Sequence, residues 1–332
     1  MIRFDRMLAC ALTLALAGQA AAQTELSMAT VSQTSDDYQL AIAWSNILGR
    51  DGRYRLTPDG GSGTVRGLRS VAQGRMDVTP IGAPHFADAL AGAGSHAEDP
   101  AALVAAYKDL RALFAIPTGM AQYVTRADAG LERIADLRGK RVAIGRPGGN
   151  AGRVTTYLFS VHGLDLDRGD YAGEYIDFGP ALDDLGDGKL DAVLVWGGVP
   201  QSGVYNLSRG TRVRFLSPDP AKLPDFQQAI TNGEFYVFRE VPAEVVRDAY
   251  GDGVAIDGPM YAWTFPMMLV VSKDMDEQTA YDLTAAIWDN VDEIRASSAQ
   301  LNLLDVSTAT QALSAELHPG AARYFRERGV IN

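Results

Sequence analysis

Three loops of the sequence combine glycine with hydroxyl or amide residues, and each one precedes a predicted helix. They span residues 31–38, 59–64 and 146–150. The first turn of a helix leaves backbone N–H groups unpaired and partially positive. Glycine lets a ligand approach this backbone, and Ser, Thr or Asn side chains add hydrogen bonds. Such loops are typical of sites that hold a carboxylate or a phosphate group.

Ordinary helix capping uses the same residue types, so one loop alone indicates a cap rather than a site. Three such loops in one chain favour a binding site. A Val-rich predicted strand at 192–196 ends in Trp196, the best candidate for a pocket aromatic. We expect ligand contacts from Thr34, Asp36, Tyr38, Ser62, Thr64, Gly149, Asn150 and Trp196, with Arg146 as a carboxylate partner and Tyr236 as a lid residue.

Two neighbouring carboxylates, Asp36 and Asp37, lie in the first of these loops. They suit a ligand ammonium group or an arginine that bridges two lobes. They equally suit a helix cap, because carboxylates stabilise the N-terminus of a helix. The sequence leaves these alternatives open.

Patterns that indicate catalysis are poor. The four histidines are widely separated, and neither a His-Glu-x-x-His motif nor a Gly-x-Ser-x-Gly motif occurs. The loop at 146–150 lacks the Gly-Lys-Ser/Thr of a phosphate-binding P-loop, and no Gly-x-Gly-x-x-Gly opens a helix. We therefore expect no catalytic residues, no cofactor and no metal.

The net charge of −11, from 30 Lys and Arg against 41 Asp and Glu, argues against a nucleic-acid partner. Proteins that bind phosphate backbones need a basic face, and this chain has no run of Lys or Arg. An anionic small ligand is still compatible, because a local pocket can oppose the global charge. The acidic surface also predicts a soluble monomer.

Residues 1–22 have the three-part order of a secretory signal peptide. A basic start precedes an apolar run at 7–18, and three alanines at 20–22 form a small-residue cleavage site. A buried first helix is the alternative. We predict cleavage after Ala22 and a periplasmic mature protein without Cys10, the single cysteine of the chain.

Strand-like and helix-like runs alternate along most of the remaining chain. This alternation is typical of an α/β fold with mostly parallel strands. A second α/β unit at 126–213 interrupts the first, which spans 23–125 and 214–332. We therefore predict two lobes with a ligand cleft between them, into which the strand-to-helix loops point.

A few segments give the clearest individual predictions. Residues 110–116 and 122–125 indicate strands that flank a connection, and residues 276–296 indicate one long helix. The apolar run at 260–271 contains Pro266 and is too short to span a bilayer, which needs about 20 residues.

The C-terminal segment 317–329 reads Leu-His-Pro-Gly-Ala-Ala-Arg-Tyr-Phe-Arg-Glu-Arg-Gly. It is similar to the closing His-Pro-Gly-Ala-x-Arg-Tyr-Tyr run of the TAXI family of solute-binding proteins from TRAP transporters. Segments 110–113, 134–142 and 188–192 are also similar, and the resemblance covers nearly the whole mature chain. These three shorter segments occur more widely among two-lobed binding proteins.

This resemblance implies a type II periplasmic binding fold, in which two strands connect lobes that close on a ligand like a Venus flytrap. It implies capture of a small organic anion, such as glutamate, a 2-oxoacid or a dicarboxylate. It also implies delivery to TRAP permease subunits in the membrane, with an ion gradient driving transport and no reaction catalysed by the binding protein.

The first loop departs from the family pattern. The family has a Gly-Thr-Gly-Gly-Thr run that ends in Tyr-Tyr-Pro, whereas residues 29–39 keep only Thr30 and Tyr38. Side chains, two of them acidic, replace glycine here, which also admits an amino acid or a larger neutral solute. Arg146 in the third loop favours a carboxylate. A periplasmic ligand sensor and, with least support, a periplasmic enzyme are the alternative functions.

Overall fold

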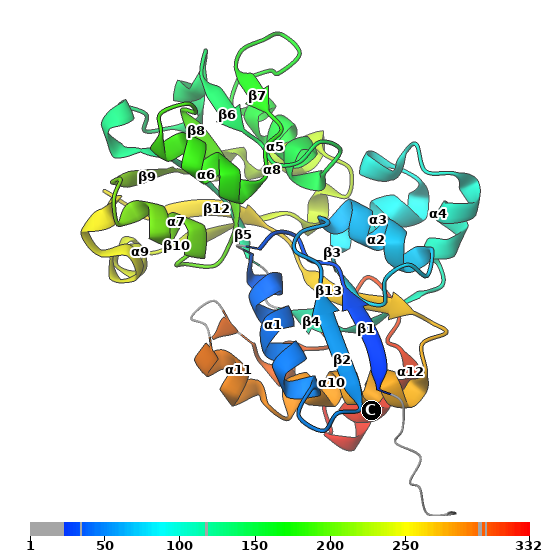
Figure 1. The fold of residues 1–332 in the computed structure, drawn as a ribbon. Helices are drawn as coiled ribbons and strands as arrows, with labels where there is room; N and C mark the ends of the chain where they lie inside the picture. The colour runs from blue at the N-terminus through cyan, green and yellow to red at the C-terminus, as the bar shows by residue number, and fades with distance from the viewer. Residues whose placement is uncertain (1–22, 34, 117–118, 298–300, 303) are drawn as a thin grey trace, which may run out of the picture.

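The computed structural model describes residues 23–332 apart from 34, 117–118, 298–300 and 303. Two lobes, each built around its own β-strands, meet near the middle of the molecule (Figure 1). The predicted two-lobed α/β fold of the periplasmic binding type is confirmed. The predicted signal peptide at 1–22 and the candidate ligand residue Thr34 lie outside the described residues.

Lobe I contains a parallel pair of strands and a three-stranded antiparallel sheet, which a bridge between Met28 and Val78 links. Its strands are β1 (Thr24–Met28), β2 (Tyr54–Pro58), β3 (Thr79–Gly82), β4 (Leu110–Ile116) and β13 (Met267–Ser272). Its helices are α1 (Asp36–Leu48), α2 (Thr64–Ala72), α3 (Ala83–Ala91), α4 (Ala101–Tyr107), α10 (Glu277–Trp288), α11 (Val291–Ser297) and α12 (Pro319–Glu327).

Lobe II is built on an eight-stranded mixed sheet with helices around it. Its strands are β5 (Met120–Arg126), β6 (Arg141–Ala143), β7 (Ala172–Glu174), β8 (Ala192–Gly197), β9 (Val213–Leu216), β10 (Val237–Val241), β11 (Val254–Ala255) and β12 (Met260–Thr264). Its helices are α5 (Asn150–Val161), α6 (Phe178–Gly186), α7 (Ser202–Ser208), α8 (Leu223–Ala229) and α9 (Ala243–Tyr250).

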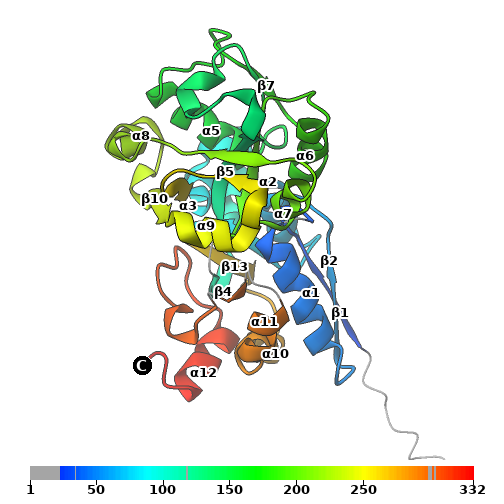
Figure 2. The same cartoon turned by 90° about the vertical axis from the view of Figure 1, so that its left-hand side faces the viewer.

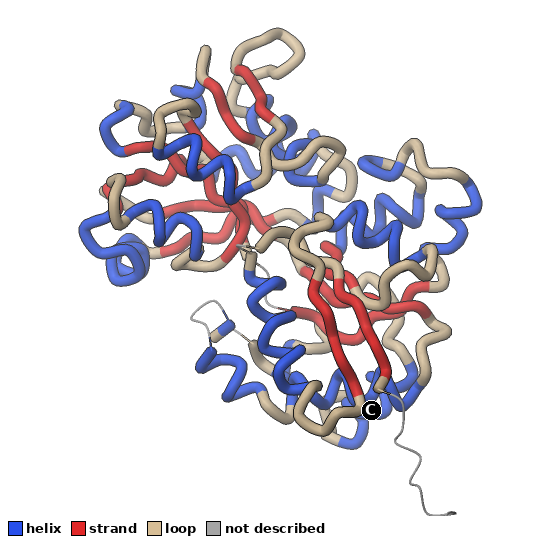
Figure 3. Tube along the Cα trace, viewed as in Figure 1, coloured by secondary structure: helices blue, strands red, loops and turns tan. Residues whose placement is uncertain are grey.

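Figure 2 shows α1, α10 and α12 in one lobe and α5, α6 and α8 in the other. β5, with which the chain enters lobe II, pairs with β8, β9 and β12. Figure 3 shows strands inside both lobes with helices around them. β8 is buried along its whole length, as its Val-rich sequence predicts. β2 alternates buried and exposed residues instead, because only one face of this edge strand meets the core.

The chain crosses between the lobes twice. It leaves lobe I after β4 and enters lobe II with β5, and it returns between β12 and β13 through Phe265 and Pro266. The two crossings are neighbours, because β12 pairs with β5 at Trp263 and Ala121 and β13 pairs with β4 at Met267 and Ile116. This arrangement provides two adjacent connections at which the lobes can rotate.

The second crossing lies later in the chain than the sequence analysis expects. The expected return to lobe I follows residue 213, but β10, β11 and β12 all belong to the sheet of lobe II. The single apolar run at 260–271 is therefore two strands in different lobes, β12 and β13. Antiparallel pairing joins segments far apart in sequence, so the local pattern could not assign β10 and β12 to a lobe.

The expected long helix at 276–296 is also divided. α10 ends at Trp288 and α11 begins at Val291. The carboxylate of Asp289 accepts hydrogen bonds from Tyr324 and Arg328, while the Asn290 amide donates to the backbone of Ala286 over 3.0 Å. Such side-chain bonds compete with helix continuation.

Candidate functional site

One cavity lies between the lobes, at the strand-to-helix loops. Its volume is ≈ 50 Å³, and residues of both lobes form its walls. Lobe I and the second crossing contribute Val31, Thr64, His85, Phe265 and Met267, and lobe II contributes Asn150, Ala151, Phe178, Trp196 and Trp263. A ligand here contacts both lobes at once, so its binding favours the arrangement in which they are together.

Four helices begin at this cavity, namely α2, α3, α5 and α6. Glycine occupies the N-cap position of the first three, at Gly63, Gly82 and Gly149, and no side chain caps any of the four. None of them has an acidic residue in its first turn. In α3 the first N–H donates to the carbonyl of Pro266 over 2.8 Å, and Pro84 has no N–H. The first N–H groups of α2 and α5, which carry partial positive charge, are therefore the ones best placed to bind an anionic group of a ligand.

The ends of α2 and α5 meet across the boundary between the lobes. The Asn150 amide donates a hydrogen bond to the Thr64 hydroxyl over 3.1 Å. Asn150 is 5 % exposed, and its Oδ1 atom has no hydrogen-bond partner although it is buried. Turning the amide would let Thr64 donate to Oδ1 and would point the NH₂ group at an anion. Asn150 and Thr64 are thus placed to bind a polar ligand group.

Aromatic rings form the wall of the cavity near the crossing. Trp196 stacks on Phe265 with ring centroids 5.0 Å apart and packs at 5.4 Å from Trp263. The indole N–H of Trp263 donates to the Tyr123 hydroxyl over 2.9 Å, so its one polar atom is already bound. This wall offers apolar contact and little hydrogen bonding.

His85 lies next to this wall. Its ring packs edge-on against Phe265 at 4.7 Å and Tyr236 at 6.1 Å, and its Nδ1 atom is buried without a partner. Burial holds the pKa of His85 well below its usual range, so the ring is neutral. Tyr236 does not line the cavity; it packs behind Phe265, and its buried hydroxyl also has no hydrogen-bond partner. It is therefore part of the packing behind the site and not a lid over it.

The two carboxylates in the first turn of α1 accept backbone N–H groups of the protein, and the Oδ1 atom of Asp36 is buried without a partner. Asp37 accepts the backbone N–H of Val31 over 2.7 Å, and burial raises its pKa to about 6. Burial raises the pKa of Asp36 to about 7, and Asp36 accepts the backbone N–H of Gly198 in lobe II. Neither side chain lines the cavity. Asp36 therefore bridges the lobes through a backbone group.

Arg146 and Ser62 lie in two of the loops beside the cavity, but neither side chain lines the cavity. Arg146 forms an ion pair with Asp177 at 2.7 Å, and a Cβ atom at Gly61 would lie 2.8 Å from its Nη2. The Ser62 hydroxyl donates to the carboxylate of Asp59. Arg146 is therefore engaged within lobe II and packs against the loop of lobe I.

The structure brings three of the candidate ligand residues together in the cavity wall: Thr64, Asn150 and Trp196. Gly149 stands beside them as the N-cap of α5, and Tyr38 lies in α1 away from the lining. The sequence analysis did not select Val31, His85, Ala151, Phe178, Trp263, Phe265 and Met267. The strand-to-helix rule that selected Asn150 would also have selected His85, which lies in the first turn after β3.

A second contact between the lobes surrounds Asp88 of α3. This carboxylate is 1 % exposed and forms an ion pair with Arg153 of α5. It also accepts hydrogen bonds from Thr231 over 3.1 Å and from Asn232 over 2.7 Å. One buried lobe I carboxylate thus binds three side chains of lobe II and holds the lobes together beside the cavity.

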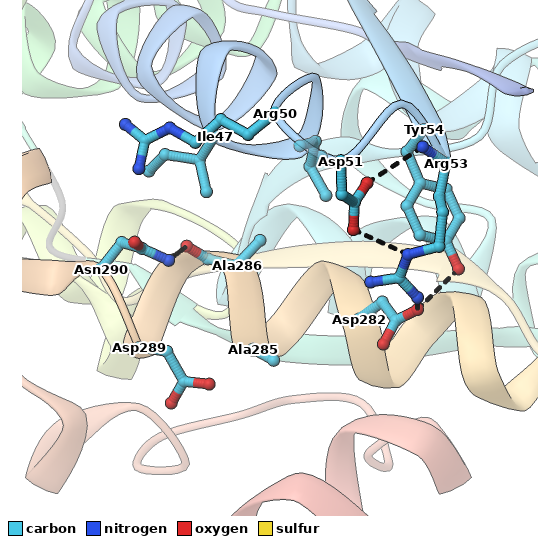
Figure 4. Close-up of a pocket in the computed structure, with 11 residues that line it drawn as sticks. Ile47, Arg50, Asp51, Arg53, Tyr54, Asp282, Ala285, Ala286, Asp289 and Asn290 are labelled. Atoms are coloured by element: carbon cyan, nitrogen blue, oxygen red, sulfur yellow. Dashed lines mark hydrogen bonds and ion pairs between the residues drawn. The ribbon is translucent and has the colours of Figure 1, made fainter.

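A different cavity, of ≈ 250 Å³, lies entirely within lobe I between the end of α1 and α10 (Figure 4). Its charged groups are paired. Arg53 binds Asp51 at 2.7 Å and Asp282, which also accepts from the Tyr54 hydroxyl over 2.9 Å. Arg50 pairs with Glu293, and Asp289 with Arg328. Arg53 and Asp51 are about half exposed. The cavity at Thr64 and Asn150, with its unpartnered buried polar atoms, is a better candidate for a ligand site than this one.

Across the residues that the structure describes, no group of three or more His, Cys, Asp or Glu side chains is placed to hold a metal ion. In the same part of the chain, none of the helices combines the length and apolar character that crossing a bilayer requires.

The two lobes, their paired crossings and the cavity between them define the class: the chain has the fold of the extracytoplasmic solute-binding proteins. A family model described as the NMT1-like family matches residues 28–329, and the chain belongs to this family.

Similar solved structures are distant in sequence. A protein of Bordetella bronchiseptica RB50 has 17 % identity and a TM-score of 0.50, covering 93 % of this chain and 90 % of its own. The alkanesulfonate-binding protein SsuA of Xanthomonas axonopodis pv. citri, bound to MOPS, has 16 % identity, coverages of 92 % and 83 %, and a TM-score of 0.46. A TRAP periplasmic solute-binding protein of Shewanella oneidensis with bound succinate has 12 % identity, coverages of 93 % and 93 %, and a TM-score of 0.47.

Proposed function

We propose that the protein is an extracytoplasmic receptor that captures a small organic anion in the interlobe cavity and delivers it to a TRAP-type permease. It catalyses no reaction, acts as a monomer and reaches the periplasm through the signal peptide at 1–22. The convergence of uncapped helix N-termini from both lobes on one cavity carries this proposal.

The N-termini of α2 and α5 belong to different lobes and meet at Thr64 and Asn150. Both ends carry partial positive charge, so bringing them together without a ligand is unfavourable. An anion between them accepts N–H groups from both lobes and removes this repulsion. The anion therefore binds the closed arrangement more tightly than the open one, which drives closure.

The TRAP assignment rests on the sequence resemblance to the TAXI family at 317–329. In the structure this segment includes α12, which packs on α10 at the far end of lobe I from the cavity. Its role in the fold is therefore separate from ligand binding.

Ligand binding is tested by thermal unfolding of the purified protein, after unfolding and refolding to remove carried-over solutes. The panel contains dicarboxylates, 2-oxoacids, amino acids, sulfonates and sugars. An anion should raise the unfolding temperature, with a stabilisation of about 2.7 kcal/mol at a hundredfold excess over the dissociation constant. The ligand should be recovered unchanged. Stabilisation by sugars alone, or turnover of the ligand, would contradict the proposal.

Delivery is tested by uptake of the radiolabelled ligand into cells, with and without the gene for this protein. Uptake should require the protein, stop when the ion gradient is collapsed and continue when ATP is depleted. Uptake that follows ATP instead would remove the TRAP assignment and keep the receptor assignment. Loss of a transcriptional response without any loss of uptake would favour the sensor function.

A further inference from the structure

We infer that the solute bound between the lobes is an organic anion with a single negative charge and a short apolar body, rather than a dicarboxylate. This inference rests on the proposed function and specifies the ligand class of the same site. It follows from the unequal distribution of polar groups around the cavity.

The polar groups that favour an anion lie at one end of the cavity. Thr64 and Asn150 begin α2 and α5, and the residues before them, Gly63 and Gly149, supply no capping side chain. The buried Oδ1 atom of Asn150 has no partner, and with the amide turned the NH₂ group in its place would donate to an anion. One carboxylate or sulfonate is enough to bind both helix ends.

The apolar side chains of the cavity wall offer no counter-charge. They belong to Phe178, Trp196, Trp263, Phe265 and Met267, which are all buried. No Lys, Arg, Asp or Glu is among the residues that line the cavity. A second carboxylate on the ligand would have to face these apolar side chains.

The two nearest arginines are engaged elsewhere. Arg146 is paired with Asp177, and Arg153 is paired with Asp88. Each guanidinium keeps a buried Nε atom without a partner, but neither side chain lines the cavity. In a dicarboxylate site we would expect an arginine at each end, because arginine binds carboxylates in a bidentate manner.

His85 offers a hydrogen bond without a charge. Its Nδ1 atom is buried and unpartnered, and burial keeps the ring neutral by holding its pKa well below the usual range. A hydroxyl or keto group of the ligand is compatible with this atom. A second ionised carboxylate would find only this one neutral hydrogen-bonding group there, without a helix N-terminus bonded to it as at Thr64 and Asn150.

The size of the cavity limits the body of the ligand. Its ≈ 50 Å³ is smaller than the roughly 150 Å³ of an apolar cavity that holds benzene. The space therefore favours a ligand with few atoms. Propionate and butyrate represent this class of ligand.

The test compares butyrate with succinate by isothermal titration calorimetry, because both have four carbons in one chain. Butyrate should bind at least about tenfold more tightly than succinate. Succinate binding as tightly as butyrate, or more tightly, would overturn the inference and leave the proposed receptor function intact.

Butyramide, a neutral analogue of the same shape, tests whether the site binds an anion at all. It should bind at least about tenfold more weakly than butyrate. If butyramide matches butyrate, or if neither butyrate nor any other anion of the panel binds, the proposed function fails together with the inference.

A charge introduced on the apolar wall gives a second test. In Met267→Lys an ammonium group faces the second carboxylate of succinate, so the ratio of succinate to butyrate affinity should rise by about tenfold. Met275→Lys, a matched change at a partly buried position outside the cavity, should leave this ratio unchanged. An unchanged ratio in folded Met267→Lys would contradict the placement of the ligand body. If this variant does not fold, the comparison in the unmodified protein decides.

Discussion

Two kinds of helix N-terminus meet between the lobes. α1 begins with Asp36 and Asp37, and both carboxylates bind backbone N–H groups of the protein itself. α2 and α5 begin after glycine and have no acidic residue in the first turn. All three follow loops that look alike in the sequence, but only α2 and α5 leave their positive ends without an anion from the protein.

This difference shows how to separate a capped helix from a binding site in this chain. The loop before α1 carries the most side chains with ligand-binding potential, and Ser35, Asp36 and Asp37 bind backbone groups of the protein. The loops before α2 and α5 carry fewer such side chains and contribute directly to the cavity wall. The absence of an internal anion is therefore more informative here than the presence of polar residues.

The largest loss of anion affinity is expected when α2 receives a carboxylate in its first turn, as α1 has. Thr64→Asp places a negative charge in the first turn, where it occupies the positive helix end. We expect anion affinity to fall about a hundredfold or more, measured by calorimetry. The unfolding temperature of the ligand-free protein should stay the same or rise.

A matched control is Thr279→Asp, the same change in the first turn of α10, whose N-cap Asp276 already accepts the N–H of Thr279 over 2.8 Å. This variant should keep full affinity. Unchanged affinity in Thr64→Asp itself would mean that α2 is not part of the ligand site.

The next change removes the side chain that links α2 and α5. Asn150→Ala loses the 3.1 Å bond to Thr64 and the unpartnered Oδ1 atom. We expect about tenfold weaker binding in the same titration. Asn290→Ala, which removes an amide bonded to the backbone of Ala286 within lobe I, should not alter affinity. Equal affinities for the two variants would argue against a polar contact at Asn150.

Removing a carboxylate from the first turn of α1 tests the role of Asp36. The folded-state pKa of Asp36, about 7, lies above its unfolded value, so the folded state holds this proton to higher pH. The free energy of unfolding should therefore fall as pH rises from about 4 to 7. Asp36→Asn removes the part of this fall that comes from Asp36 and keeps the part that comes from Asp37, whose pKa is also raised. At pH 8 the variant should be the more stable protein by at least about 1 kcal/mol. Denaturant unfolding at pH 5 and pH 8 measures the difference, which should shrink at pH 5. A constant difference across this range would contradict the raised pKa.

The smallest effect is expected at the N-cap of α5. Gly149 has φ −84° and ψ 156°, a conformation that serine adopts readily as a cap. In Gly149→Ser the new Cβ atom lies 3.2 Å from the backbone oxygen of Arg146, which offsets the gain from the cap, so the free energy of unfolding should change by no more than a few tenths of a kcal/mol. The substitution should also weaken anion binding by about two- to threefold, because the hydroxyl competes for the helix N–H groups. Gly63 has φ 74°, so Gly63→Ser should lower the unfolding temperature instead. Tighter binding in Gly149→Ser would contradict a ligand at this helix end.

Much of the fold follows from local sequence patterns. The strands at 110–116 and 120–126 and the alternation of strands and helices in both lobes were predictable, because each depends on a run of a few residues. The lobe assignment of β10 and β12 was not predictable in this way. Their pairing partners are set by contacts between distant segments, such as Trp263 with Ala121.

The site was predictable only at its polar end. Thr64 and Asn150 can be recognised from the sequence, because each is a hydroxyl or amide residue that follows a glycine at the start of a predicted helix. Phe178, Trp263 and Phe265 have the residue types of an ordinary core, and only the meeting of the lobes makes them a cavity wall. Arg146 shows the converse error, because the sequence cannot reveal that Asp177 already pairs with it.

The second crossing also touches a rear cavity. Phe265 and Met267 line the ligand cavity and, together with Gln311, a space of ≈ 500 Å³ on β4, β10 and the crossing. Lobe rotation that reshapes one space must reshape the other through these shared side chains. Since Cys10, the single cysteine, lies in the predicted signal peptide, Gln311→Cys would carry the only thiol of the mature chain. An environment-sensitive dye at that thiol would convert solute capture into an optical signal without touching the ligand.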